Sequence, residues 1–268
     1  MDGAVILYHV GRQTDSVLPS LPWYQTHRKR GLKHMAYKKE TLAKFVEKAR
    51  GTIEKRMNES FITVSLSKGN RKIGHVLNVS IMPIITCGNC TGCATYCYDV
   101  KACLQYGNVI EARARNTALM RTNIDEYFHQ IDLAMKRRKK NLYMRWHVGG
   151  EIPSYEYFEK MVENAWNHPE YKAIWTYTKM YFIVAEYIRL HGNDPKVAFP
   201  SNFHVMLSEW RGMPMYNPYH LPEFRVVFTS EGEQFPSDCT WKCPGNCDIC
   251  KSACRGCVVG ETTHAADH

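Results

Sequence analysis

The sequence contains no long apolar run. None of its hydrophobic segments approaches the roughly 20 residues that a membrane-spanning helix needs, so no membrane partner is expected. The first residues, MDGAVILYHV, also lack the basic start and the small-residue cleavage site of a secretory signal. These two absences predict a cytoplasmic protein.

Cysteine is absent between residues 103 and 239, although the chain of 268 residues contains 11 cysteines. This gap divides them into one group at 87–103 and another at 239–257. A disulfide framework is not expected in a reducing compartment, and an odd count does not suit one either. Clustered thiols in such a compartment indicate metal binding.

Acidic residues are fewer than basic ones, and the formal net charge is +9. The cations gather at 27–33, 38–56 and 136–140. Such runs fit solvated helix faces and helix ends, and they equally fit contact with an anionic partner such as nucleic acid. No nucleic-acid-binding motif in the sequence decides between these two interpretations.

The chain divides into four parts by pattern. Residues 1–60 form a basic N-terminal extension with one amphipathic helix, whose apolar residues recur at helical spacing: Leu42, Phe45, Val46, Ala49, Ile53 and Met57. In residues 61–235, predicted strands alternate with helical segments at 111–138, after the capping residue Ser154, and at 180–191. The predicted strands are 61–67, 76–85, 141–148, 172–179, 203–210 and 224–231.

Alternation of strands and helices predicts an α/β fold with a mostly parallel sheet. A closed eight-unit barrel takes about 250 residues, more than this region provides. We therefore expect a partial, open βα barrel of five to six units, related to the TIM barrel. Functional side chains should lie at the carboxyl ends of its strands.

Residues 236–260 are rich in cysteine and poor in large apolar residues, so we expect a segment that folds around metal or a cluster. Residues 261–268 are expected to form a disordered tail. The six cysteines exceed the needs of one four-thiolate site, which would hold zinc or an iron–sulfur cluster. The role of Cys239 stays open, and the expected ligands are Cys243, Cys247, Cys250 and one of Cys254 or Cys257.

The first group forms one loop directly after a predicted core strand. Its four thiols are spaced C-x2-C-x2-C-x3-C, which lets a single loop reach one metal centre, at Cys87, Cys90, Cys93 and Cys97. Four thiolates suit structural zinc, whereas a catalytic cluster needs three and leaves one iron open. The next strand ends in Gly149, Gly150 and Glu151. The glycines allow close approach of a ligand to the backbone, and the glutamate can accept from an ammonium group. An ordinary strand-to-helix turn explains the same three residues.

This combination resembles the radical S-adenosylmethionine (SAM) enzymes, in which a three-cysteine loop after the first barrel strand holds a [4Fe–4S] cluster. The spacing differs from the C-x3-C-x2-C that is usual there. The resemblance implies cluster ligands at Cys93 and Cys97 with Cys87 or Cys90. It also implies that Tyr96 lies near the adenine and that Gly149, Gly150 and Glu151 hold the amino group of SAM.

Later strand ends supply further candidates. Lys179 ends the third unit and Ser208 the fourth, where each could meet the ribose or carboxylate of SAM, or the substrate. His147 lies just before the glycines, and we expect it to be a core or positioning residue rather than a ligand.

A second resemblance covers most of the chain, from about Leu66 to Cys257. The segments LSKGNRKIGHVLNVSIMPIITC, CATYCYD, RWHVGGEI, WTYTK and CPGNCDIC resemble the phage gene product 88 family. Membership would place the protein in the cytoplasm of the host cell. In that family the cysteines matching Cys87, Cys93 and Cys97 recur, which favours these three as cluster ligands over Cys90. The family implies no particular reaction.

The leading hypothesis is an iron–sulfur enzyme of the radical SAM type. It would need an electron donor and would cleave SAM to a 5′-deoxyadenosyl radical that acts on an unknown substrate, with nucleic acid or a nucleotide as the first guess. One alternative is a zinc-binding, nucleic-acid-binding phage protein. Another is a protein that binds SAM or a cluster without radical chemistry.

Overall fold

A computed structural model describes residues 36–70, 73–88 and 92–267 of the chain. The candidate ligand Cys90 and most of the predicted basic extension lie outside these residues. Among the described helices, none combines the length and the apolar character needed to cross a bilayer.

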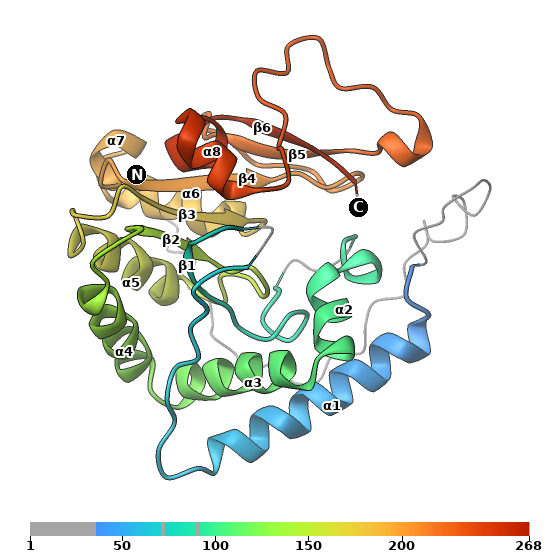
Figure 1. Ribbon diagram of the computed structural model, residues 1–268, viewed down its shortest axis with the longest axis vertical. Helices are drawn as coiled ribbons and strands as arrows, with labels where there is room; N and C mark the ends of the chain where they lie inside the picture. Colours follow the sequence, from blue (N-terminus) through green and yellow to red (C-terminus); the bar gives the residue numbers. More distant parts are fainter. Residues whose placement is uncertain (1–35, 71–72, 89–91, 268) are drawn as a thin grey trace, which may run out of the picture. The chain divides into compact units, whose positions relative to one another are not determined.

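A sheet of six strands, all parallel to their neighbours, organises the chain (Figure 1). Its spatial order follows the sequence: β1 Leu77–Val79, β2 Tyr143–Trp146, β3 Ala173–Thr178, β4 Phe203–Ser208, β5 Glu223–Val227 and β6 Thr263–Ala266. The predicted α/β fold with a parallel sheet is confirmed. The strand predicted at 61–67 is wrong, because only an isolated bridge joins Ser67 to Asn78.

Eight α-helices accompany the sheet within the described residues: α1 Lys39–Met57, α2 Tyr98–Gln105, α3 Gly107–Thr122, α4 Ile124–Arg137, α5 Tyr155–Trp166, α6 Tyr181–Leu190, α7 Pro195–Ala198 and α8 Cys247–Ala253. The described residues also form three short 3-10 helices: η2 Ala94–Tyr96, η3 Thr229–Glu231 and η4 Gly256–Val259.

Local sequence signals account for several helix boundaries. The Ser154 side chain accepts a hydrogen bond from the Tyr157 N–H and caps α5, as predicted. The helical stretch predicted at 111–138 is two helices, because Asn123 leaves the helical conformation and caps α4 through the Glu126 N–H. In α1 the predicted apolar face is buried at Leu42, Phe45, Ala49 and Ile53, whereas Met57 remains 39% exposed.

The two faces of the sheet are covered by different parts of the chain. Alternate strand residues such as Val79, Trp146 and Val205 pack with α1 and α3–α6 in one large core. The intervening residues, such as Trp175 and Met206, pack against the cysteine-rich segment. Figure 1 shows α8 on the side of the sheet opposite α4 and α5.

The expectation of a disordered tail at 261–268 is wrong for most of that stretch. Thr263–Ala266 forms β6, which pairs in parallel with β5, and Thr263, His264 and Ala265 are buried. The sequence THAA carries little strand propensity of its own. Pairing with β5 and burial against the sheet decide its conformation instead.

Candidate functional site

The loops after β1 and β2 lie side by side at the carboxyl edge of the sheet. The His147 N–H donates to the Val79 carbonyl (3.0 Å), and the Ile81 N–H donates to the Gly149 carbonyl (3.2 Å). The cysteine loop and the Gly-Gly-Glu turn are therefore neighbours, as the parallel order of their strands requires.

Three candidate ligands lie in the loop between β1 and α2. Cys93 directly precedes η2, and Cys97 directly precedes α2. The Cys87 sulfur accepts a hydrogen bond from the Ile84 N–H at 3.3 Å. Burial raises the pKa of Cys97 to about 12, helped by the nearby Asp99 and Cys87. Cys97 is therefore a thiol rather than a thiolate in this loop.

The chemistry of this donor set fits an iron–sulfur cluster, since thiolates are its usual ligands. The described sulfur atoms, however, are not arranged as a set of metal ligands. Within the described residues, no three His, Cys, Asp or Glu side chains stand close enough together to hold a metal ion. A metal centre at this loop would have to draw the sulfurs together.

Both glycines of the Gly-Gly-Glu turn have a structural explanation inside the chain. A Cβ on Gly149 would lie 1.7 Å from the Asp99 carboxylate, which Arg113 holds through two hydrogen bonds of 3.0 and 3.2 Å. Gly150 has a φ of +84°, and a Cβ there would meet Ile81 at 2.6 Å. Packing alone therefore requires a glycine at each position.

Glu151 is buried, and its carboxylate is bound by three donors. Its Oε1 accepts from the Thr178 hydroxyl (2.7 Å) and the Ile152 N–H (2.8 Å), and its Oε2 accepts from the Lys179 N–H (2.7 Å). Burial raises the pKa of this carboxyl, and the same donors oppose the rise. The side chain joins the end of β2 to the end of β3.

The other two strand-end candidates join this network. The Lys179 ammonium donates to the Ser208 hydroxyl at 2.7 Å, and the Tyr181 hydroxyl donates to the Ser208 carbonyl at 2.6 Å. The structure thus brings together Glu151, Lys179 and Ser208 from the ends of β2, β3 and β4. The strand-end rule located these residues without any knowledge of the contacts between them.

Tyr96 is 41% exposed, and its ring centroid lies 6.1 Å from that of Trp210. Trp210 also packs over the cysteine loop, because a Cβ on Gly92 would lie 2.8 Å from its ring. Its other neighbour is Phe228, at 5.7 Å between centroids, and the Arg211 guanidinium lies 3.9 Å from the Phe228 centroid. Sequence reasoning missed Trp210, although its place at the end of the predicted strand 203–210 was a usable signal.

His147 is a buried residue with a φ of +54°. Its Nε2 lies 3.1 Å from the Tyr157 hydroxyl, and its Nδ1 has no hydrogen-bond partner among the described residues. Burial lowers its pKa to about 3, and the charges of Arg145 and Arg113 add to this effect. The imidazole is neutral and belongs to the core, in line with the expectation from the sequence.

The cysteine-rich segment places its six thiols unequally. Cys250 and Cys257 are buried against the sheet, and Cys247 packs on the same cluster. Burial raises the pKa values of Cys247 and Cys257 to about 11. Cys254 is exposed at the end of α8, where its φ is +51°. Of the two alternatives that the spacing left open, Cys257 lies with the other cysteines.

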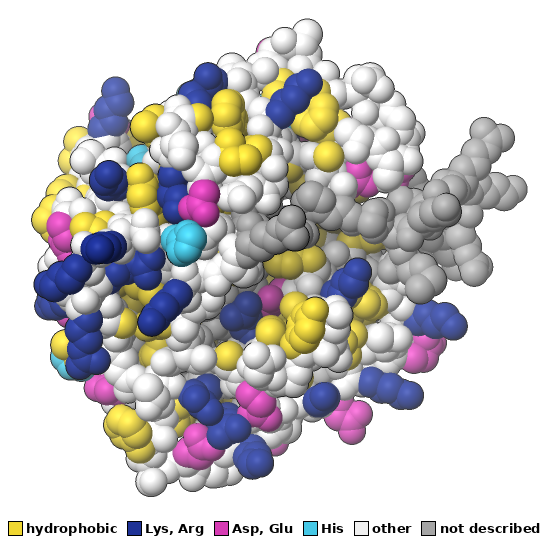
Figure 2. Space-filling model, in the orientation of Figure 1, with side chains coloured by type: hydrophobic (Ala, Val, Ile, Leu, Met, Phe, Trp, Pro, Cys, Tyr) yellow, Lys and Arg dark blue, Asp and Glu magenta, His cyan; other side chains and the backbone are white. Residues whose placement is uncertain are grey.

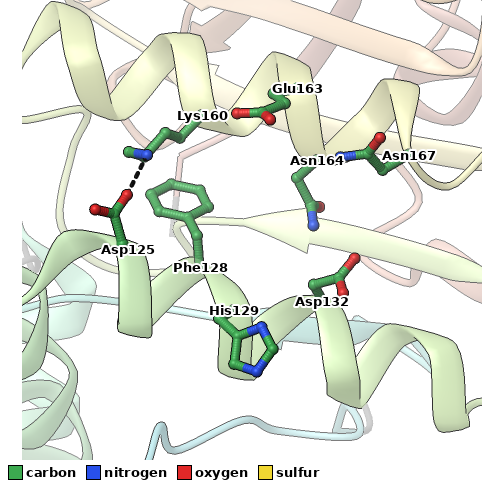
Figure 3. A pocket seen from close by; sticks show the side chains of 8 residues that line it. All are labelled: Asp125, Phe128, His129, Asp132, Lys160, Glu163, Asn164 and Asn167. Atoms are coloured by element: carbon green, nitrogen blue, oxygen red, sulfur yellow. Dashed lines mark hydrogen bonds and ion pairs between the residues drawn. The ribbon is translucent and has the colours of Figure 1, made fainter.

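A cavity of about 260 Å³ lies between α4 and α5, away from every candidate residue (Figure 3). Its lining is mostly polar: Asp125, Phe128, His129, Asp132, Lys160, Glu163, Asn164 and Asn167. Two of its carboxylates already have partners, since Lys160 pairs with Asp125 and Lys136 with Asp132. The buried His168 ring also contacts two carboxylates: its Nε2 lies 2.8 Å from Asp132 Oδ1, and its Nδ1 lies 2.9 Å from Glu170 Oε1. These pairings indicate a structural role for the lining.

The fold and the candidate site define an α/β protein with two cysteine groups on a parallel sheet, one of them at its carboxyl edge. The model of the gene product 88 family matches residues 41–237, and the chain belongs to that family. No curated protein and no solved structure matches it. The match ends before Cys239, so the second cysteine group lies outside the matched region.

Proposed function

We propose that this protein is an iron–sulfur enzyme of the radical SAM type. One observation carries the proposal: a loop with four cysteines, three of them within the described residues, follows β1, and a Gly-Gly-Glu turn follows the adjacent strand β2, at the same edge of a parallel sheet. The sequential strand order, with α1 and α3–α6 on one face, also suits the partial βα barrel expected from the sequence.

In this proposal Cys87, Cys93 and Cys97 hold a [4Fe–4S] cluster. Such a cluster, once reduced by an external donor, would pass one electron to bound SAM, whose sulfur–C5′ bond would break to give methionine and a 5′-deoxyadenosyl radical. The backbone carbonyls of Gly149 and Gly150 would accept hydrogen bonds from the SAM ammonium group. The rest of the chain positions the cofactor and excludes water.

The hydrogen bonds that Glu151 already accepts change its expected role, which was to hold the amino group of SAM. Its carboxylate is already satisfied by Thr178, Ile152 and Lys179, so it positions the turn rather than contacting SAM directly. Lys179 and Ser208 are the polar side chains proposed to meet the ribose or carboxylate of SAM. Tyr96, backed by Trp210, offers a ring for the adenine.

A nucleic acid or a nucleotide is the proposed substrate class. Figure 2 shows Lys and Arg side chains gathered on the side where Figure 1 places α4. The basic run 136–140 begins at the end of this helix, and four of its five side chains are exposed. Such a surface attracts phosphates.

Anaerobic purification followed by iron, sulfide and zinc analysis tests the cluster. Iron and sulfide in equal amounts, lost in Cys93→Ala and kept in the exposed control Cys254→Ala, are expected. The next assay is formation of 5′-deoxyadenosine from SAM with dithionite. A protein that holds zinc alone after anaerobic reconstitution would contradict the proposal.

A second candidate is a zinc-binding protein that contacts nucleic acid. The observation in its favour is that Asp99 and Ile81 already account for both glycines of the turn. It predicts zinc in place of iron and a salt-dependent affinity for DNA or RNA. Iron without 5′-deoxyadenosine would instead support a cluster- or SAM-binding protein without radical chemistry.

A further inference from the structure

Four cysteines of the C-terminal segment gather on the sheet face opposite the main helices. Cys250 and Cys257 are each only 7% exposed, and Cys247 packs against the same cluster. Cys243 is tied to β6, since its N–H donates to the His264 carbonyl at 2.7 Å. Electrostatic interactions link Cys243 to each of the other three thiols.

The remaining two cysteines of the segment stand apart. Cys254 ends α8 in a left-handed conformation, is exposed, and has its sulfur 3.8 Å from the Lys251 carbonyl. Cys239 is not a member of the buried cluster. Of the six cysteines in this segment, four therefore lie in the same region of the sheet face: Cys243, Cys247, Cys250 and Cys257.

A cation from the sheet points into the same environment. Arg145 of β2 stacks its guanidinium 4.4 Å from the Tyr177 centroid, and its charge interacts with Cys247 and Cys257. Its Nε has no hydrogen-bond partner among the described residues. By contrast, Arg113 on another part of the chain has the Asp99 carboxylate at 3.0 Å.

Arg145 is partly buried, and withdrawing a cation from water without a counter-charge is costly. No carboxylate of the described residues forms an ion pair with Arg145. The groups whose negative charge would act on Arg145 are the phenols of Tyr98 and Tyr177 and the thiols of Cys247 and Cys257. Thiolates bound to a metal ion would provide the missing negative charge.

We propose that Cys243, Cys247, Cys250 and Cys257 bind one zinc ion as a four-thiolate site, with Arg145 as its counter-charge. Four thiolates around Zn²⁺ carry a net charge of about −2, which Arg145 partly offsets. The four thiol protons pass to solvent, and nothing is oxidised or reduced. A full set of four protein ligands makes the site structural rather than catalytic.

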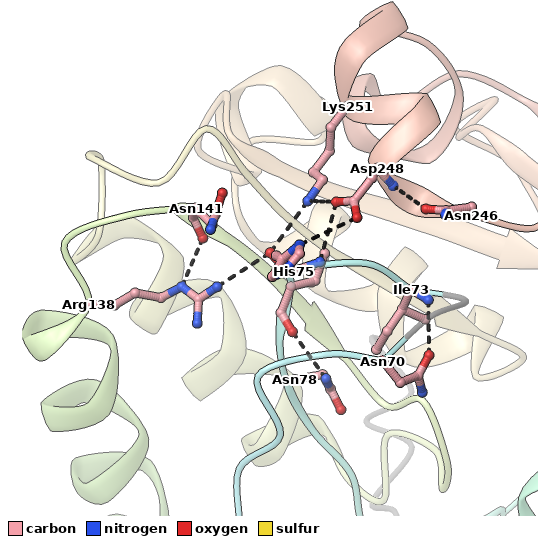
Figure 4. Close-up of polar contacts among 10 residues, drawn as sticks. Asn70, Ile73, His75, Asn78, Arg138, Asn141, Asn246, Asp248 and Lys251 are labelled. Atoms are coloured by element: carbon pink, nitrogen blue, oxygen red, sulfur yellow. Dashed lines mark hydrogen bonds and ion pairs between the residues drawn. The ribbon is translucent and has the colours of Figure 1, made fainter.

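Binding of the ion must draw the sulfurs together, since they do not form a ready ligand set within the described chain. The segment is already anchored beside them, as Figure 4 shows. The Asp248 carboxylate of α8 accepts from the His75 N–H at 3.3 Å and fills the space where a Cβ on Gly74 would stand. Lys251 pairs with Asp248 and also donates to the His75 carbonyl at 3.4 Å.

This anchoring holds one end of the site in place without the ion. Because these contacts involve no cysteine, variants that lack one of the four cysteines should still fold. The inference concerns the second cysteine group alone and does not depend on the function proposed for the first.

Zinc per chain is measured in the full-length protein and in four single variants. Cys250→Ser and Cys257→Ser are expected to lose about one zinc per chain, whereas Cys254→Ser and Cys239→Ser keep it. Iron and sulfide at the first group should not change in any of them. A failure of the radical SAM proposal would appear in the iron and sulfide contents, whereas a failure of the present inference would appear in the zinc content.

Cobalt replacement provides a second readout. The wild type should show the intense thiolate-to-cobalt absorption of a four-sulfur site, and Cys257→Ser should lose intensity while circular dichroism confirms its fold.

Zinc affinity, measured in competition with a chelator, tests the role of Arg145. Arg145→Gln should bind zinc about 10- to 100-fold more weakly than the wild type, whereas Arg145→Lys, which keeps the positive charge, should bind it almost as tightly as the wild type. Equal zinc loss in Cys254→Ser and Cys257→Ser would overturn the ligand assignment. Unchanged affinity in Arg145→Gln would overturn the role of Arg145.

Discussion

The carboxylate of Asp99 stands directly against the backbone of Gly149, so that a Cβ at residue 149 would lie 1.7 Å from Oδ2. Asp99 cannot easily move away, because Arg113 holds both of its oxygens and the carboxylate is buried. The start of α2 and the turn after β2 are thereby held against each other at the candidate site.

Gly149→Ala should therefore destabilise the fold. Forcing a methyl group into filled space typically costs about 1–3 kcal/mol, and urea unfolding measures the loss. Gly51→Ala is the control: this glycine lies in α1 with nothing within 4 Å of a built Cβ, so alanine should be neutral or stabilising there. If both variants behave alike, Asp99 is not what excludes a side chain at residue 149.

Glu151→Gln should weaken the fold although the two side chains have nearly the same shape. A glutamine must turn its NH2 toward a donor, either the Lys179 N–H or the pair formed by Thr178 and Ile152. An unsatisfied buried donor costs about 1–3 kcal/mol. The measurement is the free energy of unfolding, and exposed Glu163→Gln is the matched control. A variant as stable as the control would mean that the carboxylate charge is not needed.

His147 should make the protein sensitive to acid. Its pKa is about 3 in the fold because it is buried near Arg145 and Arg113, and about 6.5 when unfolded. Between these pH values the unfolded chain binds one more proton, so stability falls as the pH falls. The slope from this group approaches about 1.4 kcal/mol per pH unit.

His147→Asn keeps a residue type that tolerates the positive φ of this position. Its unfolding free energy should depend less on pH between 6 and 4, roughly the middle of that window, than that of the wild type. Denaturant unfolding at several pH values gives both slopes. Equal slopes would show that His147 does not carry the acid sensitivity.

Asp248→Ala should release α8 from the sheet. It removes the acceptor of the His75 N–H and the partner of Lys251. Amide hydrogen exchange in α8 should become about five-fold faster, the factor that a hydrogen bond of about 1 kcal/mol implies. Asp125→Ala, which breaks a surface pair with Lys160, should leave α8 unchanged.

The sequence predicted those elements whose cause is local. The spacing of Leu42, Phe45, Ala49 and Ile53 indicated the buried face of α1, and Ser154 marked the start of α5. Alternating elements predicted the parallel sheet, and from it the shared edge of Glu151, Lys179 and Ser208. These features follow from periodicity, capping and strand order alone.

Other features depend on packing between distant segments and leave no pattern in the sequence. The strand β6 forms because β5 offers it an edge, and the contact between Asp99 and Gly149 depends on how α2 is held by Arg113. Thiol spacing alone could not separate Cys254 from Cys257, because the left-handed residue that ends α8 decides which of them turns outward.

The strand order also bears on the order of events during synthesis. Since each strand pairs with the one before it, β1 to β5 can assemble as the chain leaves the ribosome. The cysteine-rich segment and β6 come afterwards and cover a sheet face that already exists. If the second cysteine group binds zinc as proposed, the ion would therefore enter after the rest of the sheet has formed.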